Sequence, residues 1–366
     1  MTGSPRARTS RRVVLDPRTR VLHRGDTVRV LGGDPVTMVT LAPAAAGQLE
    51  GPGLSVDTPA AAALARALTD RGMAHPDVRS TGPVATLDGV AVVVPVREDA
   101  AGVAALTASL APEMSRGLRL VVVDDGSTPP LRLPPLPSGR ARIIRHARPR
   151  GPGAARNAGT AAAVADGAEV VVYLDADVLP TPGWLEPLLA HLEDPVVAAV
   201  APRIVAAEPG RCWVRGYETA RSALDMGPLP ARVRPRTRVA YVPSAALAVR
   251  PDRLPPTPEG GGIGPFDERM RVAEDVDLCW RTDAAGGRIR YEPAARVAHR
   301  HRTAVGPLLA RRAFYGRGAA PLARRHGADV APMVVAPWSL VLAAGIWHAR
   351  PDRKSTRLNS SHTQKS

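Results

Sequence analysis

The sequence VVYLDADVLP occupies residues 171–180 and decides the fold. Residues 170–174 form an uninterrupted apolar run, which is typical of a strand buried on both faces of a sheet. Because strand side chains alternate, Asp175 and Asp177 project from the same face just beyond that run. Two carboxylates at this spacing repel one another unless a cation lies between them. The stretch therefore predicts a layered α/β domain that holds Mg²⁺ or Mn²⁺ at the end of a central strand.

An apolar run that ends in acids also occurs earlier in the chain. The sequence VVVDDGS at 121–127 ends in Asp124 and Asp125, and another apolar run, VVVPV, lies at 92–96. Ligands of open α/β sheets bind beyond the carboxyl ends of such strands. We therefore interpret the acid pair as part of a ligand site. A turn built from Asp, Gly and Ser is the alternative.

A glycine-containing helix start lies between these two acidic motifs. The sequence GPGAARNAG at 151–159 resembles a dinucleotide-binding fingerprint, but Arg156 stands where the third glycine belongs. That interpretation is excluded. Arg156 and Asn157 at a helix start nevertheless suit contact with a phosphate or a base.

A second group of acids opens a later helix, EDVDLCWR at 274–281. Glu274 and Asp275 lie in its first turn, where a carboxylate that faces a cleft can accept a proton. Asp277 and Arg281 are four residues apart, a spacing that predicts an ion pair on the helix surface.

Two histidines follow this helix. His299 and His301 lie on the same face of an extended segment. Imidazole is a common metal ligand, so either of the two is a candidate to join the proposed metal site.

Residues 90–302 resemble the family 2 glycosyltransferases. Seven motifs stand in the family's order: VVVPV, VVVDDGS, GPGAARNAG, VVYLDADVLP, GPFDERM (264–270), EDVDLCWR and VAH (297–299). The resemblance implies the GT-A fold, a mixed sheet flanked by helices, and inverting transfer of a sugar from a UDP-sugar. The Q-x-x-R-W motif of processive membrane synthases is absent, since Gln occurs only at 48 and 364.

The resemblance also assigns roles to residues of these motifs. Asp177 binds the metal on the diphosphate of the donor, His299 completes the metal site, and Asp275 is the catalytic base, with Glu274 beside it. It places the following residues around the donor, with Asp125 on the nucleotide base: Pro95, Val96, Asp124, Asp125, Arg156, Asn157 and Asp175.

The whole chain resembles a narrower group, the actinobacterial glycosyltransferases that add glucose to mycofactocin, a peptide-derived redox cofactor. The motifs that carry this resemblance are LDPRTRVL (15–22), LGGDPV (31–36), LARALTDRGMAHP (64–76), VAHRHRT (297–303) and FYGRGAAPLARRH (314–326). The first three lie in an N-terminal region that is similar to the winged peptide-recognition domains of ribosomal-peptide maturation. The resemblance thus implies a mycofactocin precursor as acceptor and a peptide partner for the N-terminal module.

The chain is expected to contain four regions. Short strands at 13–15, 27–31 and 36–41 and a helix capped by Asp57 or Thr58 predict a winged-helix-like α+β module over 1–85. The GT-A domain is expected over 86–303, and a basic and then apolar segment over 304–352. Both lysines of the chain lie within 353–366, so we interpret these residues as a foreign tail and expect the native C-terminus to be missing.

Composition narrows the functional class. The chain has 366 residues, a net charge of +15 and 45% hydrophobic residues, which excludes wholesale disorder. Twelve aromatic residues and dispersed arginines argue against a nucleic-acid partner. Two cysteines and no signal peptide predict a cytoplasmic protein. Residues 330–347 are about long enough for a membrane span, and a buried terminal helix is the alternative. The segment is therefore expected either to pack within the protein or to contact the membrane at its inner face.

Three alternatives to the leading interpretation remain open. One is a family 2 enzyme that acts on a cell-envelope glycan or lipid. Another is a nucleotidyltransferase, which shares a nucleotide-binding sheet and an acidic metal site but would release pyrophosphate from UTP. The last is a non-catalytic scaffold that binds peptides through residues 13–79.

Overall fold

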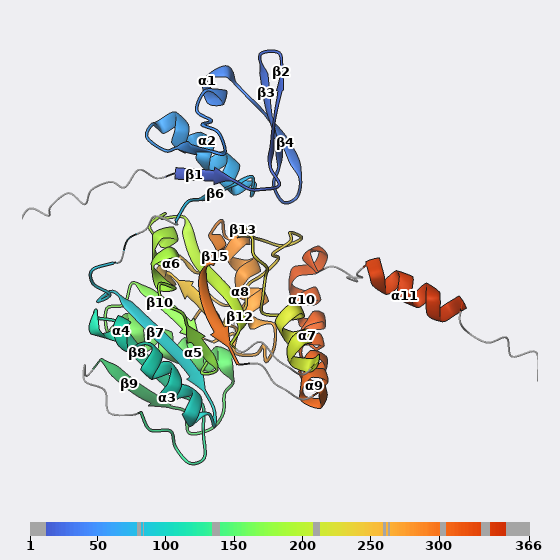
Figure 1. Ribbon diagram of the computed structural model, residues 1–366. Helices are drawn as coiled ribbons and strands as arrows, with labels where there is room; N and C mark the ends of the chain where they lie inside the picture. The colour runs from blue at the N-terminus through green and yellow to red at the C-terminus, as the bar shows by residue number, and fades with distance from the viewer. Residues whose placement is uncertain are drawn as a thin grey trace, which may run out of the picture. The chain divides into compact units, whose positions relative to one another are not determined.

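The computed structural model describes residues 12–78, 82, 84–133, 140–207, 213–258, 261–262, 264–300, 305–330 and 337–348 (Figure 1). The chain divides into two units, Met1–Asp329 and Val330–Ser366. Residues 1–11 and the foreign tail predicted from the sequence lie outside the described residues, as does His301.

The N-terminal module contains two small antiparallel sheets. One has the strand order β5-β1-β6 and the other β2-β3-β4. The predicted strands are confirmed as β1, β3 and β4, and the other three were not predicted. The bounds are β1 Arg12–Leu15, β2 Arg20–Arg24, β3 Thr27–Gly32, β4 Thr37–Leu41, β5 Gly53–Ser55 and β6 Ala74–Pro76.

Two helices complete this module, α1 (Pro43–Ala46) and α2 (Pro59–Asp70). The hydroxyl of Thr58 caps α2 by accepting a hydrogen bond from the Ala61 N–H at 3.1 Å. The apolar face of α2 packs on the strands in a separate core that includes Val30, Leu54, Leu64 and Leu68. The predicted capped helix is confirmed.

A nine-stranded mixed sheet forms the second part of this unit. Its order is β11-β15-β12-β14-β10-β7-β8-β9, and β13 pairs with β15. β7, β8, β9 and β10 run parallel, whereas β14 is antiparallel to β10 and β12. The bounds are β7 Val90–Val96, β8 Arg119–Asp124, β9 Ala141–Arg145, β10 Val170–Leu174, β11 Val178–Pro180, β12 Val197–Ala206, β13 Ala231–Val233, β14 Ala246–Val249 and β15 Arg288–His299.

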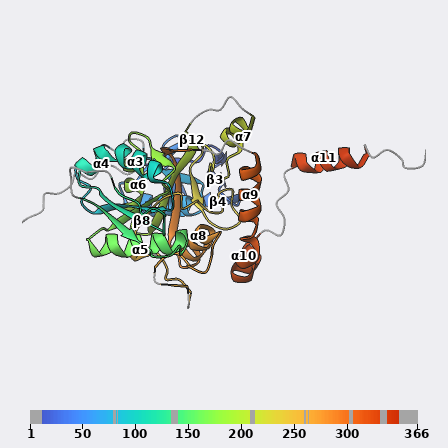
Figure 2. The ribbon, with the colours of Figure 1, turned by 90° about the horizontal axis from the view of Figure 1, so that it is seen from below.

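Helices cover both faces of this sheet. Figure 2 shows α3, α4 and α6 on one face and α5 and α8 on the other. The bounds are α3 Ala100–Ser109, α4 Ala111–Ser115, α5 Pro152–Ala165, α6 Leu185–Leu192, α7 Trp213–Arg221, the 3₁₀ helix η1 Pro251–Arg253 and α8 Glu274–Ala284. The predicted fold class, a GT-A-type mixed sheet flanked by helices behind a small α+β module, is confirmed.

The alternation of strand side chains explains this layering. The side chains of Val92 and Val94 of β7 are buried in the main core, together with buried side chains of α3 and α6. Val93 points the other way, toward α5, where the glycine at 159 lets the helix approach closely. The apolar runs are therefore continuous because each strand is covered on both sides.

The C-terminal segment is helical where the structure describes it. It contains α9 (Val305–Gly316), α10 (Ala319–His326) and the 3₁₀ helix η2 (Gly327–Asp329), and the second unit contains α11 (Pro337–His348). Within the described residues, no helix has the length and apolar character needed to cross a bilayer.

Ion pairs attach the N-terminal module to the sheet. Asp70, the last residue of α2, contacts Arg288 of β15 at 2.7 Å and Arg232 of β13 at 3.3 Å. The buried Arg290 donates to the carbonyl oxygen of Thr69 at 3.2 Å. Arg66 of α2 pairs with Asp194 at 2.9 Å. These contacts hold the module against β13 and β15.

Candidate active site

The predicted acids lie at one edge of the sheet. β7, β8 and β10 are parallel neighbours, and Val96 stands beside Asp124 in the ladder. Their carboxyl ends therefore meet, which brings Asp124, Asp125 and Asp175 to the same edge, as the sequence predicted.

Asp124 is used by the turn that follows β8. Its carboxylate is fully buried and accepts from the backbone N–H groups of Ser127 at 2.8 Å and Leu131 at 3.2 Å. The Arg145 guanidinium also contacts it. Burial alone would raise the pKa of Asp124, but these hydrogen bonds hold it below its usual range. The Asp124 side chain therefore stabilises the turn, and it has no surface exposed to solvent.

Asp125 organises the loop that leads into α5. It accepts from the N–H groups of Arg150 and Gly151, both at 2.8 Å, and bonds to His146 at 2.7 Å. Its own N–H donates to the carbonyl oxygen of Val96 at 2.8 Å. Of the two residues predicted at the end of β7, Val96 is buried and Pro95 is partly exposed.

Arg156 lies at the centre of the site. Its side chain is almost wholly buried, and it bonds to Asp175 at 2.7 Å and to Glu274 at 3.2 Å. Burial acts to lower the pKa of this guanidinium, but the charges of Asp175 and Glu274 raise it overall. Its Nε is buried and has no hydrogen-bond acceptor among the described residues. Arg156 therefore joins the two acidic motifs of the sequence.

Asn157 holds the loop that precedes α8. Its amide donates to the carbonyl oxygen of Phe266 at 2.8 Å and accepts from the Phe266 N–H at 3.0 Å. Phe266 in turn lies under the Arg156 guanidinium, 5.5 Å from ring centre to Cζ. The structure thus places Asn157 behind the site, where it supports Arg156 through Phe266.

Asp275, the candidate base, is the second residue of α8, directly after Glu274. The preceding Ala273 adopts a left-handed conformation with φ of 64°, which turns the chain sharply into the helix. Burial and the negative charge of Glu274 raise the pKa of Asp275 to about 7. A carboxyl that titrates near neutrality is suited to accept a proton at physiological pH.

Asp177 and His299 form the candidate metal pair. β11 pairs with β15 so that Val178 stands beside His299, and the Asp177 carboxylate lies 3.2 Å from His299 Nε2. One carboxylate and one imidazole fit Mn²⁺ or Mg²⁺ when the phosphates of a substrate supply further ligands. No group of three or more metal-ligating side chains occurs among the described residues.

Helix α9 contributes two residues that the sequence analysis missed. The charge of Arg311 is among the influences that lower the pKa of Asp177, and its guanidinium lies 5.6 Å from the ring centre of Tyr315. Burial raises the pKa of Tyr315, and the charges of Asp175 and Asp275 add to that effect. No spacing in the sequence singles out these residues, because the basic segment 300–325 contains many arginines.

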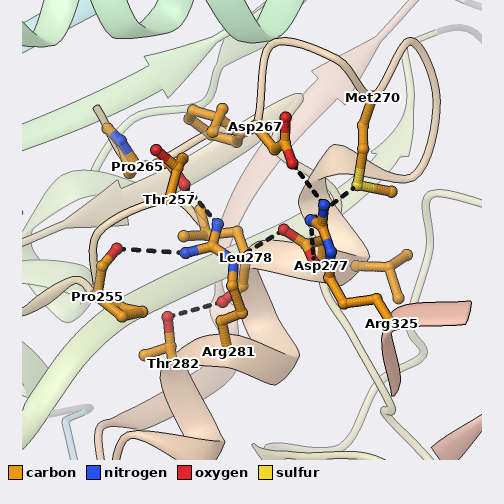
Figure 3. A network of polar contacts seen from close by, with 12 residues as sticks. Pro255, Thr257, Pro265, Asp267, Met270, Asp277, Leu278, Arg281, Thr282 and Arg325 are labelled. Atoms are coloured by element: carbon orange, nitrogen blue, oxygen red, sulfur yellow. Dashed lines mark hydrogen bonds and ion pairs between the residues drawn. The ribbon is translucent and has the colours of Figure 1, made fainter. Parts of the chain in front are cut away.

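One expectation about α8 was wrong. The predicted pair of Asp277 and Arg281 forms at 2.8 Å, but Asp277 is fully buried rather than at the surface. Figure 3 shows the reason, a network in which Arg325 of α10 also reaches Asp277. The spacing of four residues identified the pair, whereas its burial depends on a helix that lies 50 residues away in the sequence.

Comparison with known proteins identifies the family of this chain. The family described as glycosyl transferase family 2 matches residues 91–250. A protein named pre-mycofactocin glycosyltransferase, from two strains of Mycobacterium tuberculosis, is 46% identical over 331 residues. The match covers 90% of this chain and 66% of the relative, so the chain spans about two-thirds of the relative's length.

More distant matches are also found. Polypeptide N-acetylgalactosaminyltransferase 6 of Bos taurus is 28% identical, over 50% of this chain and 32% of the relative. A crystal structure of GalNAc-T7 with UDP, GalNAc and Mn²⁺ matches with a TM-score of 0.40. The two sequences are 17% identical, and the match covers 59% of this chain and 44% of the GalNAc-T7 chain. The family assignment rests on the nearer matches: this chain belongs to glycosyltransferase family 2.

Proposed function

We propose that this protein transfers a sugar, glucose on the basis of the resemblance, from a UDP-sugar to a hydroxyl group of the mycofactocin precursor. The observation that carries the proposal is the position of Arg156 between Asp175 and Glu274, the neighbour of Asp275. It joins Asp175 on the donor side to Glu274, which is the neighbour of the carboxyl with a pKa of about 7. The name of the M. tuberculosis relative supports the acceptor.

On the donor side, Asp177 and His299 would hold the divalent metal. When bound, the metal supplies Lewis-acid stabilisation of the charge that develops on departing UDP. Asp175, fixed by Arg156, and Asp125, fixed by the loop before α5, would bind the nucleotide. The protein's own hydrogen bonds thus preorganise the donor-binding carboxylates.

On the acceptor side, Asp275 would act as the general base. The acceptor oxygen attacks C1 of the sugar from the face opposite UDP, and its proton passes to the Asp275 carboxylate. The C1–O bond to the diphosphate breaks with its electron pair leaving on UDP, which inverts the anomeric centre. General-base catalysis typically contributes about 10²–10⁴-fold to the rate.

Titration of UDP with and without Mn²⁺ tests this division of roles. We expect Asp177→Ala to abolish the metal-dependent part of UDP affinity, because it removes the only carboxylate of the metal pair. Asp275→Asn should keep UDP affinity and lower transfer to the precursor by about 10²-fold or more.

Asp26→Asn is the control, since Asp26 is exposed in the turn between β2 and β3. Equal loss of UDP affinity in the Asp177 and Asp275 variants would contradict the assignment. Pyrophosphate release from UTP would instead support a nucleotidyltransferase.

We further propose that the N-terminal module binds the peptide part of the acceptor. Its β2-β3-β4 sheet exposes three large apolar side chains, Leu22, Val36 and Met38, which are 43%, 72% and 55% accessible. Fluorescence polarisation of a labelled precursor peptide, compared between the wild type and Met38→Asp, tests this partner. Binding that the substitution leaves unchanged would place the peptide elsewhere.

The membrane contact predicted for the C-terminal segment stays a prediction. What supports it is the composition of α11, which exposes Leu340, Val341 and Trp347. The helix has 12 residues, a length suited to lying at a membrane surface rather than to crossing it.

A further inference from the structure

Arg325 of α10 connects two buried carboxylates. Its guanidinium contacts Asp267 at 2.5 Å and Asp277 at 2.8 Å, and it also lies 3.4 Å from the sulfur of Met270 (Figure 3). Both carboxylates are fully buried, and a quarter of the Arg325 side chain is exposed. Within the described part of the chain, Arg325 is the one side chain that bonds to both.

The two acids lie in different segments next to the candidate active site. Asp267 lies in the loop before α8, next to Phe266, which packs against Arg156. Asp277 lies in the first turn of α8, two residues after Asp275. Arg325 therefore joins the loop that supports Arg156 to the helix that carries the candidate base.

Each acid also has contacts that do not reach the other acid. Asp267 also pairs with Arg269 at 2.9 Å, and Asp277 with Arg281 at 2.8 Å. His326, beside Arg325, bonds to Asp277 at 2.9 Å and packs edge-on against Trp280. Arg281 also connects the helix to the loop, because it donates to the carbonyl oxygen of Pro265 at 2.6 Å. Among the described side chains, however, Arg325 alone bonds to both carboxylates.

The start of α10 is also close to the turn before Asp275. A Cβ atom placed on Gly318 would lie 2.7 Å from Cβ of Ala273, the residue with the left-handed conformation. The helix is thus packed against the turn as well as bonded to both acids. Two independent contacts fix the geometry from which Asp275 projects.

Removing one charge from this arrangement has a large cost. Removing one partner of a buried ion pair leaves the remaining buried charge less well compensated. Asp267 would keep Arg269, and Asp277 would keep Arg281 and His326. Without Arg325, Asp267 and Asp277 lose their shared counterion. The loop and the helix then separate or draw in water, and Asp275 shifts with them.

We propose that Arg325 is a positioning residue that holds the loop 264–273 and the start of α8 in the arrangement required for transfer. This inference rests on the proposed function, because it assigns the consequence to the base of that reaction. It gives a role to a C-terminal segment outside the residues that the family match covers.

The test compares Arg325→Gln and Arg325→Lys with Arg324→Gln. Arg324 is the matched control, because it is exposed on the same helix and its contact is with the Ala320 carbonyl oxygen of α10 itself. Hydrogen–deuterium exchange of residues 264–277, UDP affinity with Mn²⁺, and kcat and KM for transfer are measured at a temperature where every variant is folded.

We expect Arg325→Gln to raise exchange in 264–277 and to lower kcat by about 10–100-fold. UDP affinity should change by less than about threefold, because Asp177 and His299 are held by β11 and β15. Arg325→Lys keeps the charge but not the fork that reaches both acids, so it should restore part of kcat. Arg324→Gln should match the wild type.

Wild-type exchange and kcat in a folded Arg325→Gln protein would overturn the proposal. If that variant does not fold, Arg325→Lys carries the test, and wild-type exchange and kcat there have the same meaning. A wild type that neither binds UDP nor transfers sugar refutes the proposed function instead. The exchange of 264–277 still decides whether Arg325 positions the loop in that case.

Discussion

Asp275 is the residue whose protonation should set the pH range of activity. As the proposed base, it must be deprotonated, and burial beside Glu274 raises its pKa to about 7. We expect kcat/KM to fall about tenfold per pH unit below pH 7 and to level off above it. A pH–rate profile between pH 5 and 9 checks this. A kcat/KM that stays constant down to pH 5 would mean that an ordinary carboxyl, or another group, is the base.

The same raised pKa makes a prediction about stability. A folded-state pKa above the unfolded value means that the folded protein binds the proton more tightly, so stability falls as pH rises from about 4 to 7. Asp275→Asn removes this charge. It should stabilise the protein by on the order of 2–4 kcal/mol at pH 8 and by little at pH 4, as measured by urea unfolding. Equal effects at both pH values would show that charge burial is not the cause.

Helix α5 shows how closely an element must approach the sheet to position Arg156. A Cβ atom on Gly159 would lie 2.3 Å from Val93 Cγ1, so Gly159→Ala forces the helix away from β7. Overpacking of this kind typically costs about 1–3 kcal/mol. Gly216→Ala in α7 is the control, because its Cβ would meet no atom within 4 Å, and it should be neutral or stabilising. Thermal unfolding of both variants decides whether packing or helix propensity dominates.

At the scale of elements, the sequence predicts what local patterns encode. The apolar runs at β7, β8 and β10 and the Thr58 cap of α2 are local features, and each predicted element was found there. β11 and β13 have three residues each and both pair with β15, so no local sequence pattern predicts them.

The candidate site follows the same division. Asp175, Asp177 and Asp275 stand in motifs, and sequence alone places them at strand or helix ends. The burial of Asp277 and the roles given to Arg311 and Arg325 depend on helices far along the chain. Such contacts arise from tertiary packing, which neither periodicity nor spacing records.

At the scale of the whole molecule, Asp70 is the residue of the N-terminal module that forms ion pairs with two strands of the large sheet. Asp70 forms ion pairs with Arg232 and Arg288. Burial and the charge of Arg232 lower the pKa of the neighbouring Arg290 to about 10. Asp70→Asn leaves this arginine cluster with less counter-charge and should cost about 1–3 kcal/mol. Urea unfolding checks this, with the exposed Asp26→Asn as control. An Asp70→Asn protein as stable as the control would show that the junction rests on other contacts.

The attachment at Asp70 has a geometric consequence for acceptor choice. If the module binds the acceptor peptide as proposed, that peptide would start from a constant point, and the length of its own chain would decide which hydroxyl reaches Asp275. Inserting residues into the peptide between the bound part and the acceptor would then move the position that receives sugar. Lengthening the segment between the module and the sheet would change little, because the ion pairs, and not that segment, set the distance.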